Sequence, residues 1–451
     1  MGMDRARNRM VELVGRGWDQ VKSPLYRNAL FIMMTTVIGS GLGFFFWVIV
    51  ANKYAKEDMG AAVTLFQTLG FLGALGNLGI GIGLIRFIPE TEDKQTLLNT
   101  GLTVSGIVTF VLSVGFLLSL PIVLPNLSFV LLDPLYIMTI IACTVAVGLA
   151  PILDGAAIAV RRADFQTWRI TIFAFLKIPF ALIVLASPFL KGRAGIFLSL
   201  AASFGISVVV LGFVLLRRAV PGYRPRLDFR FDRIKPLLSF SLGNYVAAAI
   251  GAAGILLPTP LIYDALGPSA GPLNAAYFYV AIVVATLLYI IPGAAFTSFY
   301  AEASHKDMDR RRGERQAIVL SLGLLIPAIA VMWLFSEPML RLFGDPAYAD
   351  EAVTPLRILS LASIPVFLNG VFGTRVRVRK RTLPLIVAAT ISTAITLGLG
   401  WILLQNPDLE IDGLAYAYVL GQAAATPYLF FKARKSYEAI PTESLLGQPL
   451  E

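Results

Sequence analysis

The sequence places a lysine, Lys177, about ten residues into an apolar stretch at 167–190. An aspartate, Asp154, lies inside the preceding apolar stretch at 135–160. If the two stretches form a helical hairpin that turns near Ala163, the two residues differ in depth by five residues, or about 7 Å along a helix. An ionisable group this deep in a hydrophobic segment is costly and indicates function. We expect Lys177 and Asp154 to pair, either as a structural ion pair or as charges that take part in anion or proton movement.

The composition excludes most other kinds of chemistry. Hydrophobic residues make up 57% of the 451 residues and charged residues only 15%, whereas soluble domains carry about a quarter charged residues. The excess apolar residues must face lipid, so the sequence predicts an all-α, polytopic membrane protein. The single Cys143 and the single His305 exclude an intramolecular disulfide, a metal cluster of such ligands and catalysis by several such residues.

Twelve apolar stretches are long enough to cross a bilayer as helices. Each has about 20 residues or more, which at 1.5 Å per residue spans a hydrocarbon core of about 30 Å. An even number of spans places both termini on the same side of the membrane. The stretches lie at about 28–52, 61–88, 98–123, 135–160, 167–190, 194–216, 237–262, 274–301, 317–336, 355–376, 383–405 and 413–432.

Positive charge is distributed unevenly between alternate connections. Of the 38 Lys and Arg residues, 31 fall in or beside the termini and the even-numbered connections, six fall in or beside the odd-numbered connections, and Lys177 lies deep inside a stretch. Basic residues accumulate on the cytoplasmic side of membrane proteins. We therefore predict a multi-pass protein of the cell (cytoplasmic) membrane, with the N-terminus and the C-terminus both inside. This pattern accounts for the net charge of +10 without a nucleic-acid partner.

The chain is predicted to contain two parallel repeats of six helices. Short motifs recur in the two halves, such as Arg161-Arg-Ala-Asp after the fourth stretch and Arg379-Lys-Arg-Thr after the tenth, 218 residues later. Repeats of this kind are related by an axis along the membrane normal, with the substrate path between them. The predicted parts are a cytoplasmic amphipathic N-terminus (1–27), an N-lobe (28–216), a basic cytoplasmic linker that tethers the lobes (217–236), a C-lobe (237–432) and a cytoplasmic tail (433–451).

Two motifs carry a resemblance to a known family. They are the loop Tyr54-Ala-Lys-Glu-Asp-Met-Gly60 and the sequence Gly79-Ile-Gly-Ile-Gly-Leu-Ile-Arg-Phe-Ile-Pro-Glu90 at the end of the second stretch. Together with the twelve stretches, they resemble oligosaccharide and polysaccharide flippases of the multidrug/oligosaccharidyl-lipid/polysaccharide (MOP) exporter superfamily, to which MATE-like transporters also belong. Ala55 and Met59 depart from the glycine and phenylalanine common in that loop. The resemblance implies a V-shaped, two-lobe helical bundle that opens alternately to each face.

The resemblance also implies a function, which is not that of an enzyme. A flippase of this family would move a lipid-linked oligosaccharide, carried on a polyprenyl phosphate or pyrophosphate, across the cytoplasmic membrane for cell-surface polysaccharide or glycan biosynthesis. Its expected partners are that substrate, membrane lipids and glycan-assembly enzymes. It would need no cofactor, and coupling to H⁺ or Na⁺ stays open.

Three other functions are alternatives to the flippase. A MATE-like drug or cation antiporter would require carboxylates deep in its spans, and the sequence offers only Asp154. A membrane glycosyltransferase or polymerase would need a large outer loop, whereas the longest outer connection, about 337–354, is short. A scaffold that transports nothing is the third.

Cations and hydrogen-bonding side chains are the candidate substrate contacts. A cavity lined by spans 1, 2, 7 and 8, as in the family, would place Arg86 where its guanidinium could grip a pyrophosphate, although snorkelling to the interface is the alternative. Lys53 and Arg357 mark outer ends of spans, and interface anchoring is their alternative. The full predicted set is Arg86, Lys177, Lys53, Arg357, Asn244, Tyr245 and Asn369.

Two further roles are predicted. Asp154, as the deep carboxylate, is the candidate for ion coupling. Pro258, Pro260 and Pro292 are candidate hinges, because breaks in a membrane helix are tolerated only against protein or a cavity.

Overall fold

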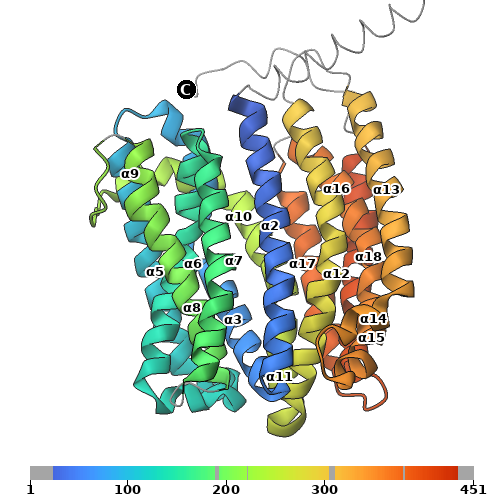
Figure 1. Cartoon of the computed structure of the whole chain (residues 1–451). Coiled ribbons are helices and arrows are strands. Elements are labelled where there is room, and N and C mark those ends of the chain that lie inside the picture. Colours follow the sequence, from blue (N-terminus) through green and yellow to red (C-terminus); the bar gives the residue numbers. More distant parts are fainter. Residues whose placement is uncertain (1–23, 188–191, 221, 304–309, 379–380, 435–451) are drawn as a thin grey trace, which may run out of the picture. The chain divides into compact units, whose positions relative to one another are not determined.

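The computed structural model describes residues 24–187, 192–220, 222–303, 310–378 and 381–434, and these residues are built from helices and their connections (Figure 1). The all-α prediction is confirmed, and no strand occurs within those ranges. Most of the predicted N-terminal segment, His305 and nearly all of the predicted C-terminal tail lie outside the described residues.

Among the described residues, eleven helices are long and apolar enough to cross a membrane, and they cover eleven of the twelve predicted spans. The twelfth predicted span corresponds to α18 (Glu410–Ala433), which is not among the eleven. Its apolar residues are interrupted by Gln422, Pro427 and several tyrosines, which lower its mean hydropathy below that of the eleven. The other long helices are α2 (Pro24–Lys53), α3 (Lys56–Gly76), α5 (Lys94–Val123), α6 (Pro134–Ala159), α7 (Ala163–Ala186), α8 (Arg193–Val209), α10 (Lys235–Leu256), α12 (Gly267–Ala303), α13 (Arg310–Leu334), α15 (Pro346–Leu361), α16 (Ser363–Val378) and α17 (Leu383–Leu404).

The shorter elements complete the connections between the long helices. Two of them, the π-helical η3 and then α9, continue α8 without a break. The short elements are α4 (Ile80–Phe87), η1 (Ile88–Glu90), η2 (Pro125–Leu132), η3 (Val210–Leu215), α9 (Leu216–Ala219), η4 (Phe231–Arg233), α11 (Pro258–Ala265) and α14 (Ser336–Arg341).

The second predicted span, 61–88, is not one helix. It is interrupted between α3 and α4, where Leu78 and Gly79 have positive φ angles of 53° and 70°. The side chain of Asn77 stabilises the turn, because its Oδ1 accepts a hydrogen bond of 2.8 Å from the Gly79 backbone N–H. The left-handed region suits glycine and strains leucine. The turn therefore lets α4 take a new direction.

The prolines behave in two ways. A helix break at Pro258 is confirmed, because α10 ends at Leu256 and Pro258 opens α11, with Pro260 in its first turn. The predicted break at Pro292 is wrong, since α12 continues through it to Ala303. Proline removes one backbone hydrogen bond, and membrane helices tolerate this loss. The hinge role of the three prolines stays a prediction.

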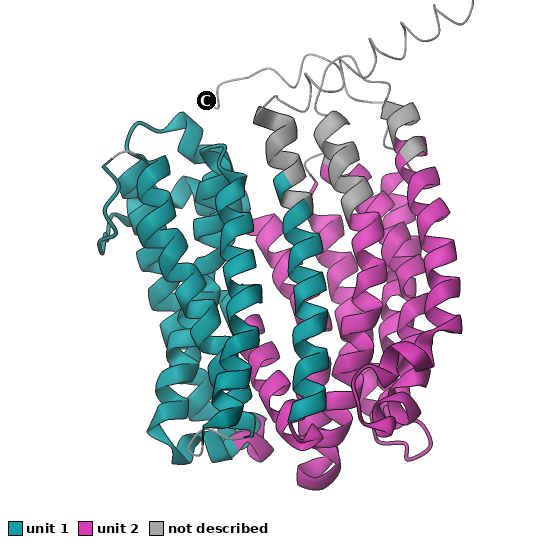
Figure 2. Ribbon diagram, viewed as in Figure 1, with its two compact units in different colours: residues 1–53, 72–123, 128–241 teal, residues 54–71, 124–127, 242–451 magenta. Residues whose placement is uncertain are grey.

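The chain divides into two compact units, and each is described here by itself (Figure 2). Unit 1 comprises residues 1–53, 72–123 and 128–241, and unit 2 comprises residues 54–71, 124–127 and 242–451. The chain passes from one unit to the other within α3 and within α10. The predicted N-lobe and C-lobe, with their boundary at 217–236, stay a prediction.

In unit 1, the predicted linker is not a free tether. Its residues 222–234, which we call the strap, run from the end of α9 to the start of α10 and lie on α5. The amide Nδ2 of Asn99 donates to the Arg224 carbonyl at 3.0 Å, and the Asp228 backbone N–H donates to Thr103 Oγ1 at 3.0 Å. Tyr223 and Ile234 are buried in the hydrophobic core formed by α4, α5 and α6. The strap is therefore part of the folded unit.

In unit 2, the loop that carries the family motif is held by close backbone packing. A Cβ atom added to Gly60 would lie 1.8 Å from the carbonyl oxygen of Pro272, and one added to Gly271 would lie 2.0 Å from that of Tyr263. Both glycines follow the first outer loop of their predicted repeat. Beside them, Lys56 Nζ pairs with Asp345 Oδ2 at 2.6 Å. Only glycine allows backbones to approach this closely, which gives a physical reason for glycine at both positions.

Candidate functional site

The candidate site is built on α7, the helix that carries Lys177. The chain turns between α6 and α7 at residues 160–162, where Arg161 has a positive φ of 60°, so the predicted hairpin turn near Ala163 is confirmed. Asp164, in the first turn of α7, is paired with Arg162, whose Nη2 lies 2.8 Å from Oδ2. An acidic residue at this end stabilises the helix through its dipole.

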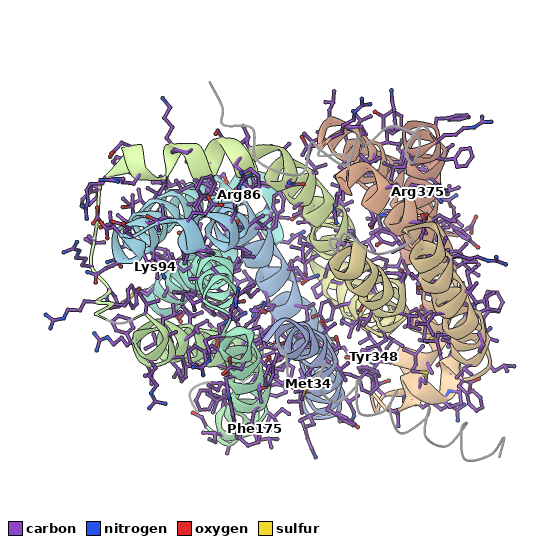
Figure 3. All side chains as sticks on the ribbon, turned by 90° about the horizontal axis from the view of Figure 1, so that it is seen from above. Met34, Arg86, Lys94, Phe175, Tyr348 and Arg375 are labelled. Carbon is purple, nitrogen blue, oxygen red and sulfur yellow. The ribbon has the colours of Figure 1, made fainter. Side chains whose placement is uncertain are left out.

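Arg169, Phe173 and Lys177 share one face of α7 because they are four residues apart. This face is directed into unit 1, and the side chains of Arg169 and Lys177 are buried. The opposite face is exposed, as shown by Phe175, whose side chain is 62% exposed at the edge of the helix bundle (Figure 3). We call this set of side chains the α7 ladder, which comprises Arg169, Phe173 and Lys177 with Asp154 from α6, Phe204 from α8 and Phe46 from α2.

At one end of the α7 ladder, Arg169 forms a bidentate ion pair with Asp154. The guanidinium Nε lies 2.7 Å from Oδ1 and Nη2 lies 2.6 Å from Oδ2. The Arg169 and Asp154 side chains are only 7% and 10% exposed. Two parallel hydrogen bonds between a planar guanidinium and a carboxylate form the strongest common type of ion pair in proteins.

The predicted pairing of Asp154 with Lys177 is therefore wrong. Asp154 lies nine residues before Ala163, whereas Arg169 lies six after it and Lys177 fourteen after it. Arg169 is thus closer in depth to Asp154 on the facing helix. The sequence contains this signal, but Arg169 lies near the start of its apolar stretch and resembles a residue of the membrane interface.

At the other end of the α7 ladder, Lys177 is buried between two aromatic rings. Its side chain is 5% exposed, and Nζ lies 4.8 Å from the ring centroid of Phe46 and 5.0 Å from that of Phe173. A Cβ atom added to Gly43 of α2 would lie 3.7 Å from Nζ. Within the described residues, Lys177 has no carboxylate partner. The ammonium is stabilised by cation–π contacts, which leave its N–H donors available.

Aromatic rings connect the two cations along the ladder. The rings of Phe173 and Phe204 meet edge to face with their centroids 5.1 Å apart. The guanidinium carbon of Arg169 lies 5.6 Å from the Phe204 ring centroid. The ladder therefore alternates charged groups and aromatic faces over about 12 Å of α7, given a rise of 1.5 Å per residue.

Arg86, also in unit 1, is exposed at the end of α4 (Figure 3). Its guanidinium carbon lies 4.5 Å from the ring centroid of Phe240 and 5.6 Å from that of Phe87. The two rings hold it by their faces, and in the part of the chain that the structure describes it contacts no carboxylate. Such a guanidinium keeps its N–H donors free for an anion.

The two cations predicted at the outer ends of spans differ from each other. Lys53 is the exposed last residue of α2. Arg357 is half-buried in α15, where its Nε donates to Ser336 Oγ at 3.0 Å and its guanidinium carbon lies 5.9 Å from the Trp333 ring centroid. These contacts fasten α15 to the junction of α13 and α14, in agreement with the anchoring interpretation of Arg357.

The predicted sugar contacts lie in unit 2. Asn369 of α16 donates from Nδ2 to the Gln422 carbonyl at 2.9 Å and accepts at Oδ1 from Thr426 Oγ1 at 2.9 Å, so its amide ties α16 to α18. Asn244 and Tyr245 are half-buried neighbours on α10. The structure thus assigns a packing contact to Asn369, and binding by these three residues stays a prediction.

Within unit 1 the structure brings together Asp154 and Lys177 as parts of one ladder, without contact between them, and it sets Arg86 apart on α4. Asp154 is neutralised by Arg169. Lys177 and Arg86 are cations held by aromatic rings, with donors available for an anionic ligand. The arrangement suits anion binding better than cation binding.

Two family models match the sequence. The model described as polysaccharide biosynthesis protein matches residues 25–296, and the model named MatE matches residues 310–402. The search of curated proteins gave no match.

Solved structures share the fold. The structure of the lipid II flippase MurJ in an inward closed conformation aligns with a TM-score of 0.66 at 15% identity, covering 90% of this chain and 87% of that one. An inward-facing multidrug resistance MATE family transporter of the MOP superfamily aligns with a TM-score of 0.64 at 13% identity, covering 90% and 97%. A MOP superfamily transporter from Pyrococcus furiosus, described as having a binding pocket of reverse polarity, aligns with a TM-score of 0.60 at 15% identity, covering 91% of this chain and 95% of that one.

Proposed function

We propose, from the premise that the chain belongs to the polysaccharide biosynthesis protein family, that it is a flippase for a lipid-linked oligosaccharide. The substrate would be a sugar chain on a polyprenyl phosphate or pyrophosphate, and the protein would carry it across the cytoplasmic membrane by alternating access. The family match and the fold shared with a lipid II flippase support this proposal.

The observation that carries the proposal is the environment of Lys177. A buried ammonium without a carboxylate is expensive to keep in a folded protein. Two aromatic faces lower that cost, but they leave the N–H donors unused. A phosphate oxygen is the acceptor that would use them. We therefore propose Lys177 as the deep anion contact.

Arg86 would be a second anion contact, at the exposed end of α4. A planar guanidinium binds a pyrophosphate through two parallel hydrogen bonds, and the rings of Phe87 and Phe240 restrict its orientation beforehand. Lys53 and Arg357 are weaker candidates on the same reasoning, since Arg357 already donates to Ser336.

A transfer assay tests the proposal. The purified full chain is reconstituted in liposomes with a fluorescent polyprenyl-pyrophosphate oligosaccharide, and leaflet transfer is followed by reduction of the exposed fluorophore. One lost hydrogen bond to a charged group costs about 1.5–3 kcal/mol, so Lys177→Met should slow transfer by about tenfold or more. Lys94→Met, which removes the same charge from an exposed position on unit 1 (Figure 3), is the matched control and should transfer at the wild-type rate.

The outcomes separate the site from the function. If the wild-type protein transfers the substrate and Lys177→Met transfers it equally fast, the role of Lys177 is wrong and the flippase assignment stands. If the wild-type protein transfers no lipid-linked sugar with any headgroup, the flippase assignment fails.

A MATE-like cation antiporter is the second candidate, because the MatE model matches residues 310–402. Such a transporter needs a deep carboxylate that can exchange a cation for a proton. The carboxylate of Asp154 is held by two hydrogen bonds from Arg169, which argues against that use. Efflux of a lipophilic cation from the same liposomes, driven by a proton or sodium gradient and absent in Asp154→Asn, would favour the antiporter.

A further inference from the structure

The strap, residues 222–234, has two faces of opposite character. Its residues 223–230 form no helix or strand. Tyr223 and Asp228 are buried among them, whereas Leu227 and Phe229 are exposed. The inner face is fixed to α5, because the buried carboxylate of Asp228 accepts at Oδ1 from Thr100 Oγ1 at 3.2 Å. The same carboxylate pairs with Arg230, whose Nη2 lies 2.6 Å from Asp228 Oδ2. These contacts hold the middle of the strap on α5.

The outer face of the strap is apolar. Leu227, Phe229 and Phe231 are 75%, 57% and 53% exposed. The two phenylalanine rings meet edge to face with their centroids 6.3 Å apart. The three large apolar side chains lie outside every helix of the described residues that could cross the membrane, and their exposure to water costs free energy. They require an apolar partner.

Cations are interleaved with these apolar side chains. The side chains of Arg226, Arg230 and Arg233 are about half exposed or more. Arg217 and Arg218 precede the strap and Lys235 follows it. Asp228 pairs with Arg230 at 2.6 Å and lies 3.7 Å from Arg226, and the exposed Asp232 lies 3.8 Å from Arg233. The cations of the strap and its ends outnumber these two carboxylates. The surface is basic and apolar at once.

We infer that the strap is a membrane-interface anchor that recognises anionic lipid headgroups. Leu227, Phe229 and Phe231 would lie at the boundary between headgroups and acyl chains, as apolar side chains of interfacial segments do. Arg226 and Arg233 would bind the lipid phosphates. Figure 1 shows the strap beyond α9, at the end and edge of the unit 1 helices, where the headgroup region of a bilayer around them would lie. The inference does not depend on the transported substrate.

Depth-dependent quenching tests the anchor on the full chain. Cys143, the single cysteine, is replaced by alanine, and Phe229→Cys is labelled with a bimane fluorophore. The control is Glu90→Cys, an exposed position of unit 1 in the connection between α4 and α5. In vesicles of phosphatidylglycerol and phosphatidylcholine, lipids brominated near the headgroup should quench the Phe229 probe at least twofold more than the Glu90 probe, and aqueous iodide should show the reverse.

The charge requirement is tested separately. Replacing phosphatidylglycerol by phosphatidylcholine should lower the lipid quenching of the Phe229 probe, and so should Arg226→Gln with Arg233→Gln. Arg377→Gln, an exposed cation of unit 2, should leave it unchanged. The inference is overturned if iodide quenches both probes equally in both lipids. It is also overturned if the Phe229 probe is shielded from lipid and iodide alike, because a partner protein or a second copy then covers the strap.

Discussion

Arg169 and Lys177 lie about two turns apart on the same face of one helix, yet their buried charges are stabilised by different contacts. Arg169 has a carboxylate in bidentate contact, and Lys177 has two aromatic faces and no carboxylate among the described residues. The Arg169–Asp154 pair is complete, so it holds α6 and α7 together and has little capacity left for a ligand. The ammonium of Lys177 still has N–H donors available, and this makes it the better candidate for binding an anionic ligand.

The difference shows that depth alone does not identify a functional charge. Two ionisable residues of α7 are equally buried, and both are expensive in a membrane. The hydrogen bonds that each group already makes distinguish a structural role, as for Arg169, from a ligand-binding role, as proposed for Lys177. The comparison predicts opposite responses to mutation, which the following experiments examine in order of expected size.

Removing the partner of Arg169 should have the largest effect. Asp154→Ala leaves a buried guanidinium without a counter-charge, which costs about 3–5 kcal/mol. We expect the unfolding free energy in detergent, or the melting temperature of the purified protein, to fall accordingly. Replacing both partners with apolar residues, as in Asp154→Leu with Arg169→Met, should recover most of the loss. If Asp154→Ala is as stable as the wild type, the pair is not structural and the comparison fails.

Removing an aromatic face of Lys177 should have a smaller effect. Phe46→Leu takes away one cation–π contact, which is expected to cost about 0.5–2 kcal/mol beyond the loss of packing. A double-mutant cycle with Lys177→Met isolates this contribution. The coupling between Phe46 and Lys177 should be positive within that range, whereas the control pair Phe46 and Lys94 should show none. A coupling near zero for both pairs would mean that the rings do not stabilise the ammonium.

The ion pair between Arg230 and Asp228 in the strap extends the comparison to a carboxylate outside the membrane spans. A hydrogen bond from the Arg230 guanidinium holds the pKa of the Asp228 carboxyl well below its usual range. A carboxyl with a lowered pKa contributes stability above its unfolded pKa of about 3.9, and this contribution is lost as the pH falls towards the folded value. Asp228→Asn should therefore be less stable than the wild type at pH 7, and the gap should narrow below about pH 4.

Unfolding of the two proteins in detergent between pH 3 and pH 7 measures this gap. The effect should be the smallest of the three, since the Arg230 side chain is about half exposed and water weakens the pair. A difference that does not change with pH would show that the hydrogen bonds of the Asp228 side chain to Thr100 and Arg230 do not depend on its charge.

Much of the fold could be predicted from the sequence, because a membrane protein displays its spans as uninterrupted apolar stretches. The helical hairpin at α6 and α7 and the break before Pro258 follow from such local signals. The left-handed turn at Leu78 and Gly79 could not be predicted, because leucine rarely adopts that conformation. It depends on the side chain of Asn77, whose contact becomes visible only in three dimensions.

The candidate site was predicted less completely. The depth of Lys177 was evident from the sequence, but its partners were not. Phe46 is more than 100 residues away along the chain, and phenylalanine is common in any membrane span. The hairpin predicted that Asp154 pairs with a cation of the facing helix, but it led to Lys177, and the structure was needed to show that Arg169 is the partner. The sequence identifies the ionisable groups whose burial is energetically costly, and the packing of the helices determines which contacts stabilise them.

The strap also matters for anyone who divides this protein into two co-expressed pieces. The loop after α9 looks like the natural place to cut, but a first piece that ends at Val220 loses Tyr223 from its core and the Asp228 carboxylate from α5. The strap would instead be attached to the second piece and would lack its contacts with α5 and the core of unit 1. A break between Ile234 and Lys235, at the start of α10, keeps the whole strap with the helices that hold it.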